Sequence, residues 1–386
     1  MDDAQTARLL QDLVRIPSVN PHGDPGTTRT GEAGVVEYLA EFFRKLALDI
    51  EIHEVEPGRA NLIGKFTSRG GKRSVAFAPH TDTVSVAGMT IDPFGGEIRD
   101  GKLYGRGATD TKGSLAAFLA AVSNVVRQKD SREGDLDVYF CALMGEESGN
   151  DGARALAGRG FKPDFLIAGE PTGCRVVYTH KGSLWFELIT RGKSIHAAMP
   201  ERGENAIGKM AEVVRYLLGE YAESLRRSGM PAATGRDKNV APTVKNPLGA
   251  PTVSVGVIRG GSQTNIVPDY CEIEVDRRTV PGEDHAAIVA EICAQLDVEV
   301  QGVRDCPPLF TDPSNEFVRR LVAASDAELA GAPWFCDASI FAAYGVPAVA
   351  FGPGSTEQAH TADEWVELAE VLRAAKIVEK FLRTAA

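Results

Sequence analysis

Two kinds of hydrophobic pattern divide this chain. Apolar residues run almost without interruption through four short segments, at 74–78, 138–144, 165–168 and 347–351. Such runs are typical of parallel strands that helices cover on both faces. In the middle of the chain, residues 252–257 and 270–276 instead alternate between apolar and polar positions. Alternation is typical of an antiparallel sheet with one buried face. The pattern therefore predicts two different sheets.

Helical periodicity and turn residues place the other elements. Helices are predicted at 4–15, 30–46, 152–158, 204–219, 283–295, 315–330 and 364–383, with one more just after Asp110, and further strands at 49–56 and 60–66. We therefore predict an α/β fold in two domains. A discontinuous catalytic domain, 1–177 and 306–386, holds a mixed, largely parallel sheet covered by helices. Residues 178–305 form an inserted α+β domain of order β-α-β-β-α-β, in which 228–251 is a long loop.

Composition and charge exclude some classes of binding partner and some kinds of cysteine site. The 386 residues can bury two cores, and 42 basic against 53 acidic residues give a net charge of −11. Such an acidic chain is not expected to bind nucleic acid or an anionic membrane. The first residues lack a secretion signal, and the six cysteines are scattered without a Cys-x-x-Cys pair. We therefore expect a cytoplasmic protein without a disulfide framework or a thiolate zinc site.

Acidic residues and histidines follow the uninterrupted strands. The candidates are His80, Asp82, Glu146, Glu147, Glu170 and His360, with Asp110 just before a helix. Alone, each has an ordinary explanation, since Asp110 could cap that helix and a Glu-Glu pair is often a solvated turn. Together, groups that follow parallel strands converge at one edge of the sheet, where like charges need a cation. Two imidazoles and several carboxylates suit zinc, cobalt or manganese, so the spacing predicts a metal site.

The motifs also occur in the order that one protein family shows. They are His80-Thr-Asp82, Gly105-Arg-Gly-Ala-Thr-Asp110-Thr-Lys-Gly113, Glu146-Glu147, Gly169-Glu-Pro171 and Ala359-His360. The series resembles the di-zinc amidohydrolases and exopeptidases that include acetylornithine deacetylase, succinyl-diaminopimelate desuccinylase, aminoacylase and glutamate carboxypeptidase. The likeness covers essentially the whole chain, and the insert at 178–305 is similar to that family's lid or dimerisation domain.

The resemblance implies two divalent metal ions, zinc in the first place and cobalt or manganese as alternatives. Asp110 would bridge both ions. The ligands of one ion would be His80 and Glu170, and those of the other Glu147 and His360. The resemblance also implies a cis peptide bond after Asp110.

The catalytic residues follow from the same resemblance. Asp82 would support the imidazole of His80 and fix its tautomer. Glu146 would be the general base, although the residues alone cannot choose between Glu146 and Glu147. In the insert, His196 matches a lid histidine that enters the active site of the other subunit, which implies a homodimer formed through the lid.

Two further residues, Asn265 and Arg278, match lid positions of the family that bind the substrate's carbonyl and carboxylate. An arginine suits a carboxylate because its guanidinium binds it bidentately. Gly354 is the third predicted substrate-binding residue, from its place in the chain. A salt bridge at a strand end is the alternative interpretation of Arg278. Gly354 shapes the loop before His360 and lets a ligand approach its backbone.

The expected reaction is hydrolysis of an amide. A hydroxide shared by the two metals, with Glu146 as base, would remove an acetyl or succinyl type of acyl group from an N-acyl amino acid. The alternative on the same site is a metallo-exopeptidase, a dipeptidase or a glutamate-type carboxypeptidase, acting on a short peptide. A non-catalytic binding protein on the same fold is a third hypothesis, which the complete set of ligands disfavours. Nucleophilic serine, phosphate-loop and dinucleotide motifs are absent.

Overall fold

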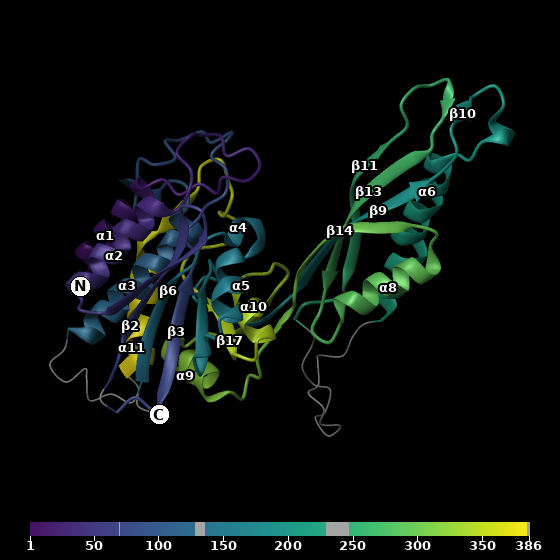
Figure 1. Cartoon of the computed structure of the whole chain (residues 1–386). Helices are drawn as coiled ribbons and strands as arrows, with labels where there is room; N and C mark the ends of the chain where they lie inside the picture. The colour runs from purple at the N-terminus through teal and green to yellow at the C-terminus, as the bar shows by residue number, and fades with distance from the viewer. Residues whose placement is uncertain (69, 128–135, 229–246, 384–386) are drawn as a thin grey trace. The chain divides into compact units, whose positions relative to one another are not determined.

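A computed structural model describes residues 1–68, 70–127, 136–228 and 247–383. The chain forms two compact units (Figure 1). The first unit consists of Met1–Tyr178, Thr311–Ala330 and Cys336–Ala386, and the second of Thr179–Phe310 and Gly331–Phe335. The predicted domain boundaries are 177/178 and 305/306, and no local pattern in the sequence marks Gly331–Phe335 as part of the second unit. Most of the expected loop at 228–251 lies outside the described residues.

A nine-stranded mixed sheet, most of whose strands belong to the first unit, has the order β1-β2-β6-β3-β7-β17-β8-β15, with β16 (Leu329–Ala332) beside β8. Four neighbouring strands are parallel: β6 (Leu136–Ala142), β3 (Arg73–Pro79), β7 (Phe165–Gly169) and β17 (Ala348–Phe351). These are the four uninterrupted apolar segments, so the predicted fold class is confirmed. The flanking strands pair antiparallel: β1 (Asp49–Glu56), β2 (Arg59–Phe66), β8 (Val176–His180) and β15 (Leu309–Phe310).

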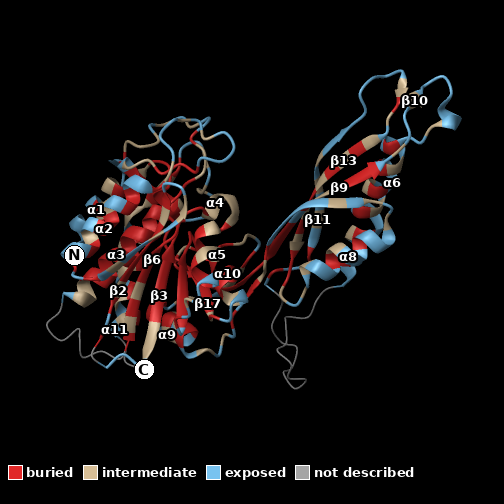
Figure 2. Cartoon of the chain, viewed as in Figure 1, coloured by how far each residue is buried: buried red, intermediate tan, exposed pale blue. Residues whose placement is uncertain are grey.

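Helices cover both faces of this sheet, and the strands between them are buried (Figure 2). One face carries α1 (Asp3–Arg15), α2 (Ala33–Lys45), α3 (Gly113–Val126), α9 (Glu316–Ser325) and α11 (Leu368–Arg383). On this face Phe77 of β3 contacts Phe118 of α3, and Phe165 of β7 stacks on Phe317 of α9. The opposite face carries α5 (Asp151–Gly158) and α10 (Asp337–Ala343). Burial on both faces explains why the parallel strands have no polar alternation.

The second unit is built on a four-stranded antiparallel sheet of order β11-β13-β9-β14. Its strands are β9 (Gly182–Arg191), β11 (Thr252–Gly260), β13 (Tyr270–Thr279) and β14 (Glu299–Cys306). The helices α6 (Ala206–Tyr216) and α8 (His285–Gln295) pack on one face, where alternate residues of β9 and β13 are buried. The main elements follow one another as β9-α6-β11-β13-α8-β14, which is the predicted order β-α-β-β-α-β. A small two-stranded antiparallel sheet, β10 (Ile195–His196) with β12 (Ile266–Val267), also belongs to this unit.

Two predicted helices were too long. The helix expected at 315–330 ends at Ser325, and Leu329–Ala332 forms strand β16 instead. The helix expected at 364–383 begins at Leu368, because Trp365–Glu367 is strand β18. That strand pairs with β5 (Lys102–Tyr104), which pairs in turn with β4 (Glu97–Arg99). Helical spacing of apolar residues continues through both strands, so periodicity alone could not find these boundaries.

Candidate metal centre

His80 lies directly after β3, at the carboxyl end of the parallel strands. Its Nδ1 is 3.0 Å from the backbone oxygen of Asp82 and 3.4 Å from Asp82 Oδ1. This acceptor holds a proton on Nδ1. Nε2 lies 3.0 Å from Asp110 Oδ1 and would carry the lone pair in the neutral ring that a metal ligand requires. The imidazole is therefore oriented as a metal ligand would be.

Asp110 lies between two imidazoles. One carboxylate oxygen is near His80, and Oδ2 is 3.3 Å from Nε2 of His360. The backbone of Asp110 is not helical, and the Asp110–Thr111 peptide bond is cis, as predicted. The next helix, α3, has Lys112 as its N-cap residue and no side-chain capping bond. Asp110 is therefore not the helix cap that its position before α3 allowed.

Glu147 and His360 complete the cluster. His360 adopts a left-handed backbone conformation with φ of 64°, and its Nε2 is 3.4 Å from Glu147 Oε2. Ligand atoms of His80, Asp110 and Glu147 all lie within 4.8 Å of one another. Glu147 Oε1 is buried and has no hydrogen-bond partner in the described part of the chain. A buried carboxylate oxygen without a donor is costly unless a cation is its partner.

Asp82 holds the turn that carries both glutamates. Its Oδ1 accepts from the backbone amide of Glu146, and its Oδ2 accepts from that of Glu147, each at 3.1 Å. The side-chain amide of Asn20 donates to Oδ2 at 2.8 Å. Glu146 and Glu147 begin the short helix α4 (Glu146–Gly149), which follows β6. Asp82 therefore positions His80 and the Glu-Glu turn with a single carboxylate.

Two further carboxyl groups lie close to the Glu-Glu turn. The side-chain amide of Asn150 is 2.9 Å from Asp337 Oδ1 and 3.4 Å from Glu146 Oε1. Burial raises the pKa of Asp337 to about 6. Glu170 follows β7 and is buried, and burial together with the charge of Asp110 raises its pKa well above the usual range. The sheet thus places Glu170 close enough to the cluster for the charge of Asp110 to affect its pKa.

The electrostatics of the cluster favour a cation. Burial, opposed by the charge of His80 but aided by Glu170 and Glu147, raises the pKa of Glu146 well above its usual value. Burial also raises the pKa of Glu147. Hydrogen bonds to Asp110 and Glu147 raise the pKa of His360 to about 10. In the absence of metal, these groups relieve their mutual repulsion by retaining protons. Divalent cations would replace those protons, so the donor set fits hard or borderline metal ions.

The second unit carries the other predicted residues. His196 lies in β10 and Asn265 directly precedes β12 in the small two-stranded sheet, where the amide of Ala197 donates to the backbone oxygen of Asn265 at 2.9 Å. Both side chains are exposed. Arg278, on β13, makes an ion pair with Asp276, whose Oδ1 is 3.0 Å from Nε, and its guanidinium lies 5.5 Å from the ring centre of Phe335. In this state Arg278 makes the salt bridge that was its alternative interpretation.

Gly354 has a steric reason to be glycine. Its φ is 85°, and a Cβ there would lie 2.1 Å from Oγ1 of Thr109. Its amide donates to Glu370 Oε2 at 2.8 Å. The loop before His360 therefore packs directly against the residue that precedes Asp110.

Sequence reasoning missed four polar residues around the cluster. They are Asn20, Asn150, Asp337 and Glu364, and all four are buried. The sequence pattern places Glu364 within a predicted helix and Asp337 in a segment without a predicted element. The position of an acid four residues after the candidate ligand His360 is the one sequence feature that singles out Glu364.

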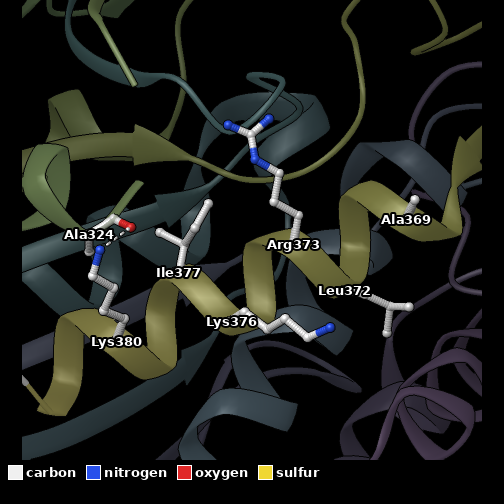
Figure 3. A pocket seen from close by; sticks show the side chains of 7 residues that line it. All are labelled: Ala324, Ala369, Leu372, Arg373, Lys376, Ile377 and Lys380. Atoms are coloured by element: carbon white, nitrogen blue, oxygen red, sulfur yellow. Dashed lines mark hydrogen bonds between the residues drawn. The ribbon is translucent and has the colours of Figure 1, made fainter. Parts of the chain in front are cut away.

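A groove along α11 lies apart from these residues (Figure 3). Its volume is about 420 Å³, and Arg373, Lys376 and Lys380 line it together with apolar side chains. Lys380 donates to the backbone oxygen of Ala324 at 3.4 Å. The side chains that line this groove include no carboxylate or imidazole, so it offers no metal ligands.

Comparisons with known proteins agree with the fold and the cluster. A model of peptidase family M20/M25/M40 matches residues 76–384. A Staphylococcus aureus protein named "Probable succinyl-diaminopimelate desuccinylase" is 30% identical, covering 95% of this chain and 93% of that protein. Acetylornithine deacetylase of Proteus mirabilis is 30% identical, covering 94% and 92%. The structure of an M20 family metallo-carboxypeptidase from Sulfolobus solfataricus superposes with a TM-score of 0.74 at 20% identity, covering 99% of each chain.

The fold, the cluster and these relatives define a metal-dependent hydrolase. The chain belongs to peptidase family M20/M25/M40. The predicted family resemblance and the predicted enzyme class are therefore confirmed. Among the described residues, no helix combines the length and apolar character that crossing a membrane requires.

Proposed function

We propose that this enzyme hydrolyses the amide of an N-acyl amino acid and releases a carboxylate and a free amine. The observation that carries the proposal is the placement of Glu146 beside the cluster of His80, Asp110 and Glu147. The names of the two curated relatives, a desuccinylase and a deacetylase, support an acyl group of succinyl or acetyl type.

The ligands proposed for two divalent ions, with zinc as the first candidate, are the residues that the resemblance implied. Asp110 would contact both ions, His80 and Glu170 one of them, and Glu147 and His360 the other. Bound cations of this kind polarise an amide carbonyl and lower the pKa of water towards neutrality. The chain's own contribution to their binding is orientation: Asp82 fixes the tautomer of His80 and holds the turn of Glu147.

Glu146 is the proposed general base. It accepts a proton from the attacking water at its carboxylate and donates a proton to the nitrogen of the departing amine as the C–N bond breaks. The surroundings suit this cycle, because burial and the neighbouring Glu170 and Glu147 raise the pKa of Glu146. A raised pKa makes the Glu146 carboxylate a stronger base towards the proton of the attacking water.

The second unit is the proposed lid and dimerisation domain. His196 would reach the active site of a partner subunit and stabilise the tetrahedral oxyanion, and Asn265 would bind the same carbonyl. Arg278 would leave Asp276 and bind the substrate carboxylate. The exposure of His196 and Asn265 at one small two-stranded sheet supports a role outside their own unit. The proposed compartment is the cytoplasm, which the presence of all six cysteines as thiols supports.

A metallo-exopeptidase is the second candidate. The likeness to a metallo-carboxypeptidase over 99% of both chains favours it as an alternative on the same fold. Substrate size separates the two candidates, because a peptidase accepts an amino-acid residue where a deacylase accepts a short acyl group.

The test is a hydrolysis screen of N-acetyl amino acids, N-succinyl amino acids and dipeptides. Each is assayed with the purified enzyme, after EDTA treatment, and after addition of zinc, cobalt or manganese. We expect turnover of the acylated amino acids, its loss with EDTA and its return with metal. If dipeptides are hydrolysed faster than the acylated amino acids, the exopeptidase hypothesis would replace the deacylase hypothesis. Full activity in metal-free enzyme would overturn the metal centre.

A further inference from the structure

Glu364 is completely buried, although no step of the proposed reaction uses it. Its carboxylate accepts four hydrogen bonds from one short segment of chain. Oε1 accepts from the backbone amides of Thr109 at 2.9 Å and Asp110 at 3.1 Å. Oε2 accepts from the amide of Gly107 at 3.2 Å and from Nη1 of Arg106 at 2.7 Å. One side chain therefore accepts hydrogen bonds from the backbone amides of Gly107, Thr109 and Asp110.

The main chain on either side of Glu364 is tied to the same region. Its backbone oxygen accepts from the amide of Gly105 at 2.9 Å, and β18 (Trp365–Glu367) pairs with β5 (Lys102–Tyr104). His360 lies only four residues before Glu364. Glu364 therefore joins the segment of one candidate ligand to the segment of another.

The backbone amides that donate to Glu364 do not have the hydrogen-bond acceptors that a regular helix would supply. Residues 108–112 form an irregular turn in which Asp110 has φ of −122° and ψ of 91°, so its amide is not part of a regular helix. Buried backbone amides need an acceptor, and an ionised carboxylate is a strong one. The direction of the Asp110 side chain follows from this backbone. The distances from Asp110 to His80 and His360 depend on it as well.

We propose that Glu364 is a positioning residue for the metal centre: its carboxylate fixes the 107–110 backbone so that Asp110 faces both histidines. The proposal rests on the proposed role of Asp110 as a metal ligand. Groups that orient a ligand typically change metal affinity by about 10- to 100-fold when they are removed. Glu364 would act without touching substrate or metal.

The decisive variant is Glu364→Gln. A glutamine keeps the size of the side chain but directs an NH₂ group towards donors, so one pair of hydrogen bonds is lost. We expect zinc and cobalt to bind about 10- to 100-fold more weakly by titration calorimetry. We also expect a change in the visible absorption spectrum of the cobalt-loaded protein. The matched control is Glu367→Gln, three residues further on in strand β18, whose carboxylate lies 3.6 Å from Lys102 at the surface. Its affinity should equal that of the wild type.

A second variant keeps the test decisive if Glu364→Gln does not fold. Glu364→Asp retains a charge for Arg106 but is one methylene shorter, so it cannot serve both amides on the Oε1 side. A folded Glu364→Asp or Glu364→Gln protein with wild-type metal affinity and cobalt spectrum would refute the positioning role. So would a variant that loses thermal stability in EDTA but binds metal normally, because its role would be structural. If the wild type itself binds no metal, the proposed function fails, whatever the Glu364 variants do.

Discussion

The two units hold their candidate residues in opposite ways. In the first unit, Asp110, Glu147 and His80 are buried or partly buried and lie within hydrogen-bonding or ion-pair distance of neighbours that orient them. In the second unit, His196 is exposed on a small two-stranded sheet, and Arg278 pairs with Asp276. The first arrangement is assembled within a single unit. Under the proposed function, the second would become a binding site only when a substrate or a partner is present.

This difference separates the free energy of metal binding and of the chemical step from the free energy of substrate binding. Orientation in the first unit is achieved during folding, so its residues should govern metal content and the chemical step. The residues of the second unit should govern substrate binding and closure, and metal content should not depend on them. Each of the following predictions tests that separation.

The largest effect should come from the residue that contacts both histidines. Asp110→Ala should bind neither metal, whereas His80→Ala should lose one of the two. Because metal ions supply several kcal/mol of transition-state stabilisation, activity of Asp110→Ala should fall by about 10⁴-fold or more. Metal-to-protein ratios by plasma emission spectrometry provide the measurement. Equal metal content in the two variants would contradict the bridging role.

Removal of the base should separate metal binding from chemistry. Glu146→Gln should lower kcat by about 10²- to 10⁴-fold, because proton transfer is lost, with metal content unchanged. Steady-state kinetics and metal analysis of one preparation test this together. If Glu146→Gln loses metal and Glu147→Gln retains it, the roles of the two glutamates are reversed.

The first prediction for the second unit concerns His196. His196→Ala should reduce kcat by about 10²- to 10³-fold, the usual effect of one lost oxyanion donor, and should keep both metals. Mixing His196→Ala with inactive Glu146→Gln tests the proposed action across the dimer. Activity should reappear as hybrid dimers form, since one active site then has both residues. Sedimentation must show a dimer, and an active monomer would contradict this role.

Arg278 should affect binding more than chemistry. Arg278→Lys keeps the charge but loses bidentate recognition, so KM for an N-acyl amino acid should rise by about tenfold or somewhat more. Asp276→Asn is the matched control, because it weakens the competing ion pair. We expect its KM to fall slightly or stay constant. A large kcat effect of Arg278→Lys with constant KM would place Arg278 elsewhere in the reaction.

The smallest expected effect is a pH dependence of metal affinity. The pKa of His360 is raised to about 10 in the metal-free protein, so at neutral pH its imidazole carries a proton that metal must displace. Affinity should therefore rise with pH, by about tenfold per pH unit for each proton released. Calorimetry in two buffers with different ionisation enthalpies counts these protons. His360→Gln should release about one fewer, and a pH-independent affinity would contradict the assignment.

Much of the first unit could be predicted because its signals are local. An uninterrupted apolar strand followed by His80 or Glu170 predicts both a buried parallel strand and a candidate ligand at its carboxyl end. Four such strands proved to be neighbours in the sheet. The metal cluster follows from that arrangement.

The contacts that position the ligands could not be predicted in the same way. Glu364 and Asp110 are 254 residues apart in the hydrogen bond that joins them, and no local pattern marks such a pair. Asn20 and Asp82 are likewise joined at a separation of 62 residues. The helix boundaries at Ser325 and Leu368 failed for a related reason, because strand pairing with distant segments decided them.

The place of β17 in the sheet has a consequence for synthesis of the chain. This strand lies between β7 and β8, yet it follows β7 by the whole length of the second unit. Until residues 348–351 leave the ribosome, the edge of β7 has no permanent neighbour on that side. An open, apolar edge is an aggregation hazard, and contacts between distant segments form slowly. Dependence on chaperones during translation should therefore be greatest for nascent chains that end before this strand.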